Sequence, residues 1–221
     1  MLSADSEAPT PTIDEQLAND GDQAQRNASE RNRILDAAEK AIAVHRHGDP
    51  GVHDILREAG VSGRTLYAHF ASKDELYVGL VRRAFDVEIA TMTGRLGQTN
   101  DPRTRIEIWI DAYLDWHFHA GQLSNRSVLI AGPVTRASGY LEAVKDCRRQ
   151  IALVLAESIT RATVAGQATS TNPMLDAVSM RAIIDGVCEE LETPAPMTDR
   201  AAAKAHVKRF AWAALGLTDT A

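Results

Sequence analysis

Polar side chains cluster in one short stretch of predicted helix, residues 63–70. Leu66 and Phe70 lie four positions apart, so they share one face of this helix and are expected to be buried. The remaining side chains then face outward or sideways. Their hydrogen-bonding groups are poorly suited to a protein core but well suited to a surface that enters a groove of another molecule. These polar side chains are Arg64, Thr65, Tyr67 and His69.

The chemistry that suits these groups is recognition of double-stranded DNA. The guanidinium of Arg64 can donate two parallel hydrogen bonds to O6 and N7 of guanine in the major groove, so Arg64 is the expected base-reading residue. Thr65 suits a thymine methyl group or a phosphate, and the polar tips of Tyr67 and His69 suit phosphate oxygens. Lys73 adds a positive charge at the start of the next helix, where anions bind readily.

The elements that must position these side chains lie within residues 51–70. A short helix over 52–59 ends at Gly60, which can adopt the left-handed conformation of a turn. Val61 fills the angle between the helices, and Ser62 has the hydroxyl needed to cap the next one. Two short helices joined by a three-residue turn predict a helix-turn-helix.

Helical periodicity also covers the rest of the chain from Ser29 to Leu217, with no alternating apolar and polar stretch of strand length. The first helix is predicted to begin at an N-cap on Ser29 and to end near Arg46, and Ser72 is predicted to cap a helix that continues to about Leu96. The fold is therefore predicted to be all-α. Further helices are expected over 102–120, 123–131, 138–164, 173–191 and 198–216.

The charge of the 221-residue chain is unevenly distributed. Residues 1–25 contain six acidic residues and no Lys or Arg, so this segment accounts for the whole net charge of -6. Because it has almost no large apolar side chains, we expect it to be a disordered acidic tail. Residues 26–83 carry ten basic and eight acidic residues, which indicates a basic N-terminal module on an acidic body.

Several classes of protein are disfavoured by the same sequence. The longest apolar run, 151–156, is too short to span a membrane, and no signal peptide is recognisable, so a cytoplasmic protein is expected. Cys147 and Cys188 cannot form a disulfide framework and are expected to be reduced core residues. His117 and His119 point about 200° apart on a helix and cannot easily share a metal ion. No nucleophile or carboxylate pair has a convincing catalytic neighbour, so neither an enzyme nor a cofactor is expected.

Three aromatic residues, Trp109, Tyr113 and Trp116, share one face of the predicted helix 102–120. Ordinary core packing is one interpretation. The other is that they line a cavity for a small-molecule effector, where the rings supply contact area and Tyr113 a polar tip.

Residues 29–83 resemble the TetR (tetracycline-repressor-like) family of bacterial transcriptional regulators. The resemblance rests on the order and spacing of several short motifs rather than on any one of them, and it covers about a quarter of the chain. The motifs are Arg31-Asn-Arg-Ile-Leu-Asp-Ala-Ala-Glu39, Asp54-Ile55, Ala59-Gly60-Val61-Ser62, Thr65-Leu66-Tyr67, His69-Phe70 and Ser72-Lys73-Asp74-Glu75-Leu76.

The resemblance implies two domains: a helix-turn-helix DNA-binding domain over 26–75, and a C-terminal domain over 76–221 that binds an effector and forms a homodimer. The last two helices, rich in small residues, would supply the dimer interface. One departure is the link Gly48-Asp49-Pro50-Gly51, which is short, lacks an aromatic residue and places Gly51 where a capping hydroxyl is usual. The expected DNA-binding residues are Arg31, Gly51, Ser62, Gly63, Arg64, Thr65, Tyr67, His69 and Lys73.

The function predicted from the sequence is sequence-specific DNA binding by a homodimer on a palindromic operator, as a repressor relieved by a small ligand. The alternative is a helical ligand-binding or protein-interaction module that does not bind DNA. Each candidate also has a structural interpretation: Arg31 and Arg64 as solvated charges, Tyr67 as a packing residue, and Lys73 as a charge at a helix terminus.

Overall fold

The computed structural model describes residues 13–45, 49–118, 129–193 and 196–217, and within these ranges it contains nine helices and no strand. The predicted all-α fold is confirmed. The helices are α1 (Ile13–Val44), α2 (Val52–Ala59), α3 (Gly63–His69), α4 (Lys73–Leu96), α5 (Pro102–Phe118), α7 (Gly132–Thr135), α8 (Tyr140–Val164), α9 (Pro173–Leu191) and α10 (Arg200–Leu215).

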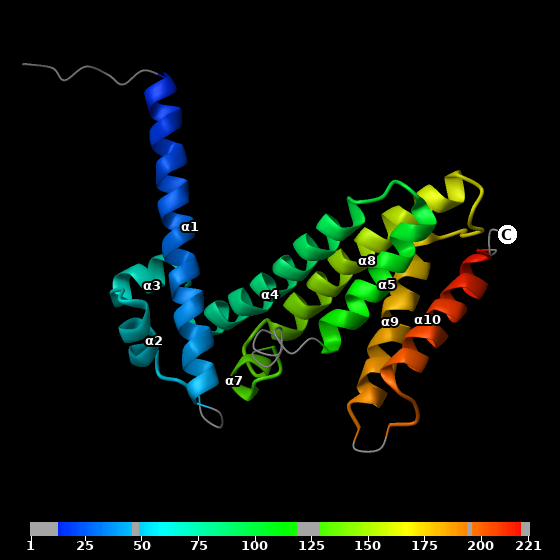
Figure 1. The fold of residues 1–221 in the computed structure, drawn as a ribbon. Coiled ribbons are helices and arrows are strands. Elements are labelled where there is room, and N and C mark those ends of the chain that lie inside the picture. Colours follow the sequence, from blue (N-terminus) through cyan, green and yellow to red (C-terminus); the bar gives the residue numbers. More distant parts are fainter. Residues whose placement is uncertain (1–12, 46–48, 119–128, 194–195, 218–221) are drawn as a thin grey trace, which may run out of the picture.

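The N-terminal domain is built from α1, α2, α3 and the start of α4 (Figure 1). Helices this short are not stable alone, so their apolar faces must pack on one another. Side chains of all four helices meet in a common core and lose almost all contact with solvent. This core contains Ile34, Leu35, Ala38, Ile55, Leu66, Phe70, Leu76 and Leu80.

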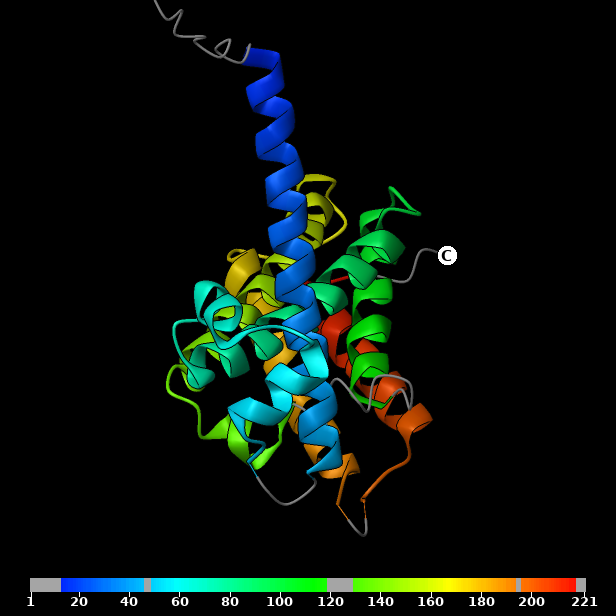
Figure 2. The same ribbon diagram turned by 90° about the vertical axis from the view of Figure 1, so that its left-hand side faces the viewer.

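The start of α1 differs from the prediction. The helix begins at Ile13 rather than at Ser29, so residues 13–25, expected to be disordered, form its first turns. Once the packed part of a helix is formed, each further residue adds a hydrogen bond without a new nucleation cost, and Gln23 reinforces this by donating to Asn27 at 3.0 Å. Figures 1 and 2 show these turns extending beyond the rest of the molecule. Residues 1–12 lie outside the described ranges.

The C-terminal domain is a bundle in which α4, α5, α8 and α9 pack around a second part of the core, with α10 beside α9 and α5 (Figure 1). At the joint between the domains, the backbone N–H of Ser138 donates to the carboxylate of Asp74 at 3.1 Å. Among the described helices, none is long and apolar enough to cross a membrane.

The segment between α5 and α8 also differs from the prediction. A short helix, α7, occupies Gly132–Thr135, where the sequence predicts only a connecting segment. Its Val134 is fully buried, so tertiary packing rather than local propensity accounts for it. Most of the predicted helix 123–131 lies outside the described residues.

Candidate nucleic-acid interface and ligand site

The helix-turn-helix has the local geometry that its sequence predicts. Gly60 closes α2 in the left-handed region, with φ of 61°. The Ser62 hydroxyl accepts a hydrogen bond from the backbone N–H of Thr65 at 3.0 Å and so caps α3. Leu66 and Phe70 are each 1% exposed, and these contacts fix which face of α3 points to solvent.

The outer face of α3 presents two of the predicted DNA-contacting side chains freely. Arg64 is exposed, and Tyr67 is 55% exposed. Thr65 is only half-exposed, and its hydroxyl lies 2.9 Å from the Ser62 hydroxyl, so it also supports the cap. Arg64 and Tyr67 are therefore the side chains best placed to enter a groove.

His69 is in a different environment. Its Nε2 lies 3.2 Å from a carboxylate oxygen of Glu30 on α1, and the imidazole is mostly buried. This contact joins the last turn of α3 to α1, so His69 positions the helix whether or not it also reaches a phosphate.

Lys73 is paired within the domain. Its ammonium lies 2.7 Å from Asp49, and the hydroxyl of Tyr77 donates to the same carboxylate at 2.6 Å. Burial opposes ionisation of Asp49, but the hydrogen bonds from Lys73 and Tyr77 outweigh it and hold the pKa of Asp49 below its ordinary value. Burial, with the hydrogen bond to Asp49, raises the pKa of Tyr77 well above its ordinary value. Asp49 thus fastens the short α1–α2 link to α4.

Two arginines of α1 support the same domain. The Arg31 guanidinium lies 4.9 Å from the centre of the Phe70 ring, a cation–π contact, so this predicted phosphate ligand packs inside the domain. Arg33, for which the sequence predicts no role, donates to the carbonyl of Ala59 at 2.8 Å and thereby satisfies the C-terminal end of α2. Only the three-dimensional approach of α1 to α2 reveals this role.

The two glycines of the predicted site lie at helix starts. Gly51 is the N-cap of α2 and has no side chain to accept a bond there, so α2 begins without a side-chain cap. It is exposed, and Gly63, the first residue of α3, is half-buried. The backbone N–H groups at such ends are the donors that phosphate contacts use.

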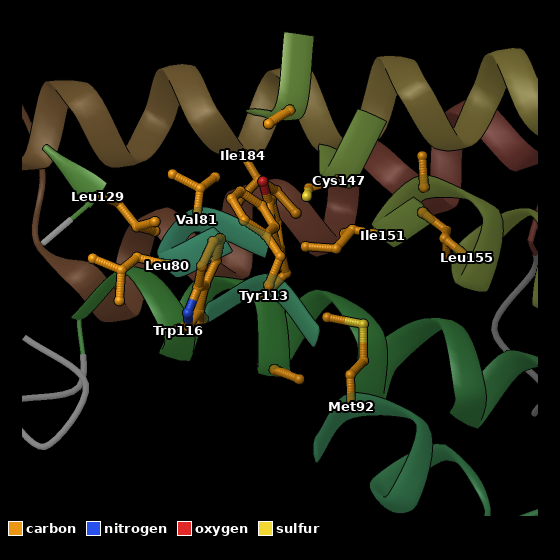
Figure 3. Close-up of a cluster of buried hydrophobic side chains, with 14 of the residues drawn as sticks. Leu80, Val81, Met92, Tyr113, Trp116, Leu129, Cys147, Ile151, Leu155 and Ile184 are labelled. Carbon is orange, nitrogen blue, oxygen red and sulfur yellow. The ribbon is translucent and has the colours of Figure 1, made fainter. Parts of the chain in front are cut away.

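The predicted ligand-binding aromatics lie in the core of the C-terminal domain, where Figure 3 shows Tyr113 and Trp116 among apolar side chains. Trp109 stacks on Tyr113 with ring centres 5.1 Å apart, and the ring centres of Tyr113 and Trp116 lie 5.8 Å apart. The Trp109 indole N–H donates to the Ile151 carbonyl at 3.2 Å. This geometry matches core packing; contact of these rings with an effector stays a prediction.

A charged cluster lies beside these rings around Asp185 of α9. The Tyr113 hydroxyl donates to Asp185 at 2.7 Å, Arg181 forms a short ion pair with it, and Nε2 of His117 lies 3.5 Å away. Burial opposes ionisation of Asp185, but His117, Tyr113 and Arg181 together hold its pKa below the ordinary value. His117 thus contacts Asp185, and its predicted neighbour His119 lies outside the described residues.

Both cysteines are buried and free, as predicted. Burial raises the pKa of the Cys147 thiol to about 11. A thiol in this state is a poor nucleophile, which fits a packing role.

Comparison with known proteins places this site in a family. Residues 34–80 match the family described as bacterial regulatory proteins of the tetR family. The chain is 33% identical over 92 residues to the transcriptional activator FasR of Mycolicibacterium smegmatis, a match that covers 42% of each chain. It is also 29% identical over 98 residues to the transcriptional regulator BetI of Brucella anthropi, covering 44% of this chain and 48% of BetI. The N-terminal part of this chain thus matches the TetR family.

The TetR-family fold extends beyond the matched sequence. A TetR-family regulator from Mesorhizobium loti superposes with a TM-score of 0.63 at 18% identity, covering 85% of this chain and 96% of that one. A regulator from Saccharomonospora viridis, solved in complex with choline, superposes with the same TM-score at 22% identity, covering 83% and 95%. The sequence matches span less than half of FasR and BetI, whereas the structural matches include the C-terminal domain.

The link between α1 and α2 is a departure from the usual TetR-family sequence, and the structure describes it from Asp49 onward. Asp49 from this link contacts both Lys73 and Tyr77 of α4. An ion pair and a hydrogen bond thus hold Asp49 against α4.

Proposed function

We propose that this protein is a sequence-specific DNA-binding transcriptional regulator that acts as a homodimer on a palindromic operator. The observation that carries the proposal is the outer face of α3, where Arg64 and Tyr67 project from a helix whose other face is anchored by Leu66 and Phe70. In helix-turn-helix proteins such a second helix lies in the major groove. Gly51, Ser62, Gly63 and Thr65 border that face and are assigned to phosphate or base contacts.

Phosphate contact is also assigned to His69, Lys73 and Arg31. These three side chains differ from Arg64 because they have partners inside the protein. Each already interacts within the domain: His69 with Glu30, Lys73 with Asp49, and Arg31 with the Phe70 ring. A phosphate must share or replace these partners, so we assign them weaker contributions than Arg64.

Dimerisation is assigned to α9 and α10. A groove of about 820 Å³ runs between them, lined by small and apolar residues that include Ala182, Val187 and Ala202. Phe210 of α10 is half-exposed. Small side chains allow helices of two copies to approach closely, and covering this apolar surface favours association.

We assign the C-terminal domain to an effector that relieves repression. The S. viridis relative was solved in complex with choline, a small molecule, and this supports the assignment of a small-molecule effector to this chain. In the proposed mechanism, effector binding favours a dimer in which the two α3 helices no longer fit successive major grooves. The family consists of regulators, and we propose that this chain is cytoplasmic and has no catalytic activity.

The deciding experiment is selection of bound fragments from the genomic DNA of the source organism with the purified chain, followed by gel-shift titration of the enriched sequence. Enrichment of a palindrome bound by two chains supports the proposal. If no sequence is enriched over random DNA, the alternative of a helical module that does not bind DNA is favoured. Sedimentation of the free protein tests the dimer separately.

A further inference from the structure

A second groove, of about 530 Å³, lies between α8 and α9. One part of its lining is apolar. Leu141 and Leu175 are 80% and 59% exposed, and Val144, Met174 and Val178 are half-buried against the core. Large apolar side chains gathered in an exposed groove favour a partner that covers them.

The other part of the lining is cationic. Lys145, Arg148, Arg149 and Arg181 line the groove, and no carboxylate does among the described residues that form it. Arg181 is mostly buried and is paired with Asp185. Arg148 is 48% exposed, and its Nε lies 3.9 Å from Asp185, so this ion pair is long and the guanidinium remains accessible.

We propose that this groove binds an aliphatic carboxylate, with its head on Arg148 and Arg149 and its chain over Leu141, Val144 and Leu175. Arginine matches a carboxylate with two parallel hydrogen bonds, and burying the chain removes apolar surface of both partners from water. The volume of the groove lies in the range of small-molecule sites.

A second copy of the chain is the poorer occupant. In a two-fold contact the same patch meets itself, so the cations of one groove would face those of the other, which is unfavourable. The groove also lies on a different side of α9 from the one facing α10. Val178 and Ile183, which line the two grooves, are five residues apart and point about 140° from each other.

The groove is connected to the aromatic core through Asp185. This carboxylate contacts Arg148 and Arg181 at the groove and accepts a hydrogen bond from Tyr113, whose ring contacts those of Trp109 and Trp116. A bound carboxylate that draws Arg148 away from Asp185 changes the surroundings of these rings. Only the consequence for DNA, a lower operator affinity, rests on the proposed function.

Calorimetric titration of the full chain with dodecanoate, without DNA and below the micelle concentration, tests the binding. We expect the double variant Arg148→Gln/Arg149→Gln and the single variant Leu175→Glu to weaken binding by roughly tenfold or more. The control double variant Arg57→Gln/Arg161→Gln removes two positive charges from exposed arginines outside the groove and should bind as the wild type does. Uncharged dodecanol should bind more weakly than dodecanoate, and dodecanoate should change tryptophan fluorescence.

Equal affinity of the wild type and both groove variants would overturn the proposal, as would loss of binding in Arg57→Gln/Arg161→Gln. Dissociation of the free dimer by Leu175→Glu, seen in sedimentation, would assign the groove to a second copy instead. Operator binding is measured separately in the absence of dodecanoate. A failure of that measurement rejects the proposed function without touching the binding result.

Discussion

Arg64 has the simplest surroundings of the polar side chains on α3, because it projects into solvent from a capped helix. Arg64→Ala should leave the fold and the dimer intact and weaken operator binding by about 1–3 kcal/mol, the typical value of a bidentate base contact. Gel-shift titration on the operator and on random DNA measures this. Arg57→Ala, an exposed arginine of α2 paired with Asp54, is the matched control. An equal loss on both DNAs would mean that Arg64 contacts the backbone rather than a base.

Lys73 gives a different prediction because Asp49 already neutralises it. If Lys73 also contacts a phosphate, Lys73→Ala should weaken binding to all sequences alike and lower the salt slope by about one. Asp49→Asn removes the competing carboxylate and should tighten binding at low salt. Salt titrations of both variants provide the measurement. Unchanged slopes in both would restrict Lys73 to its contacts with Asp49 and Tyr77.

At the scale of elements, the Asp185 cluster joins α5 to α9, and its stability should depend on pH. The pKa of Asp185 is lower in the folded chain than its ordinary value, so the folded state favours the ionised form. Asp185 therefore stabilises the fold above its unfolded pKa, and this contribution is lost as the pH falls through that value toward the folded one. We expect Asp185→Asn to lower the free energy of unfolding by about 1–3 kcal/mol at neutral pH.

Urea unfolding at a series of pH values measures this effect. The difference between wild type and Asp185→Asn should be constant above about pH 5 and shrink below about pH 4. A difference that stays constant down to pH 3 would show that ionised Asp185 does not contribute to stability.

The aromatic face of α5 allows a test between core and effector site. Trp109 is fully buried, so Trp109→Ala should cost about 3–5 kcal/mol of stability and impair folding and DNA binding together. Tyr113→Phe keeps the ring and removes only the hydrogen bond to Asp185. If these rings also contact an effector, this variant should lose effector response while keeping its melting temperature within a few degrees and its operator affinity unchanged. A normal response in Tyr113→Phe would leave packing as the function of Tyr113.

At the scale of the whole molecule, the first turns of α1 carry acidic residues beyond the domain core (Figure 1). Like charges repel, so the acidic residues 1–25 should weaken DNA binding rather than contribute to it. Deleting them should leave operator affinity equal or slightly higher, most visibly at low salt, where screening is weak. Gel shifts at two salt concentrations measure this, with circular dichroism as the control for folding. A large loss of affinity would mean that this segment contacts DNA.

Local sequence signals determined much of this protein. Gly60, Ser62 and Ser72 act at helix ends through their own backbone or hydroxyl, and the helical spacing of apolar residues placed Leu66, Phe70 and Cys147 in the core. Such signals depend on neighbours a few positions away, so a sequence is enough to detect them. The bounds of α2, α4 and α9 follow for the same reason.

Tertiary structure alone decided which polar side chains remain available to contact DNA. The sequence cannot show that Arg31 packs on Phe70, that Lys73 meets Asp49 or that His69 meets Glu30, because each pair joins residues that are 24 or more positions apart. The sequence also could not show whether Trp109 and Tyr113 pack in the core or line a ligand cavity, since both roles need the same apolar face of a helix. The apolar and cationic lining of the α8–α9 groove also appears only when the two helices pack, because each contributes only part of it.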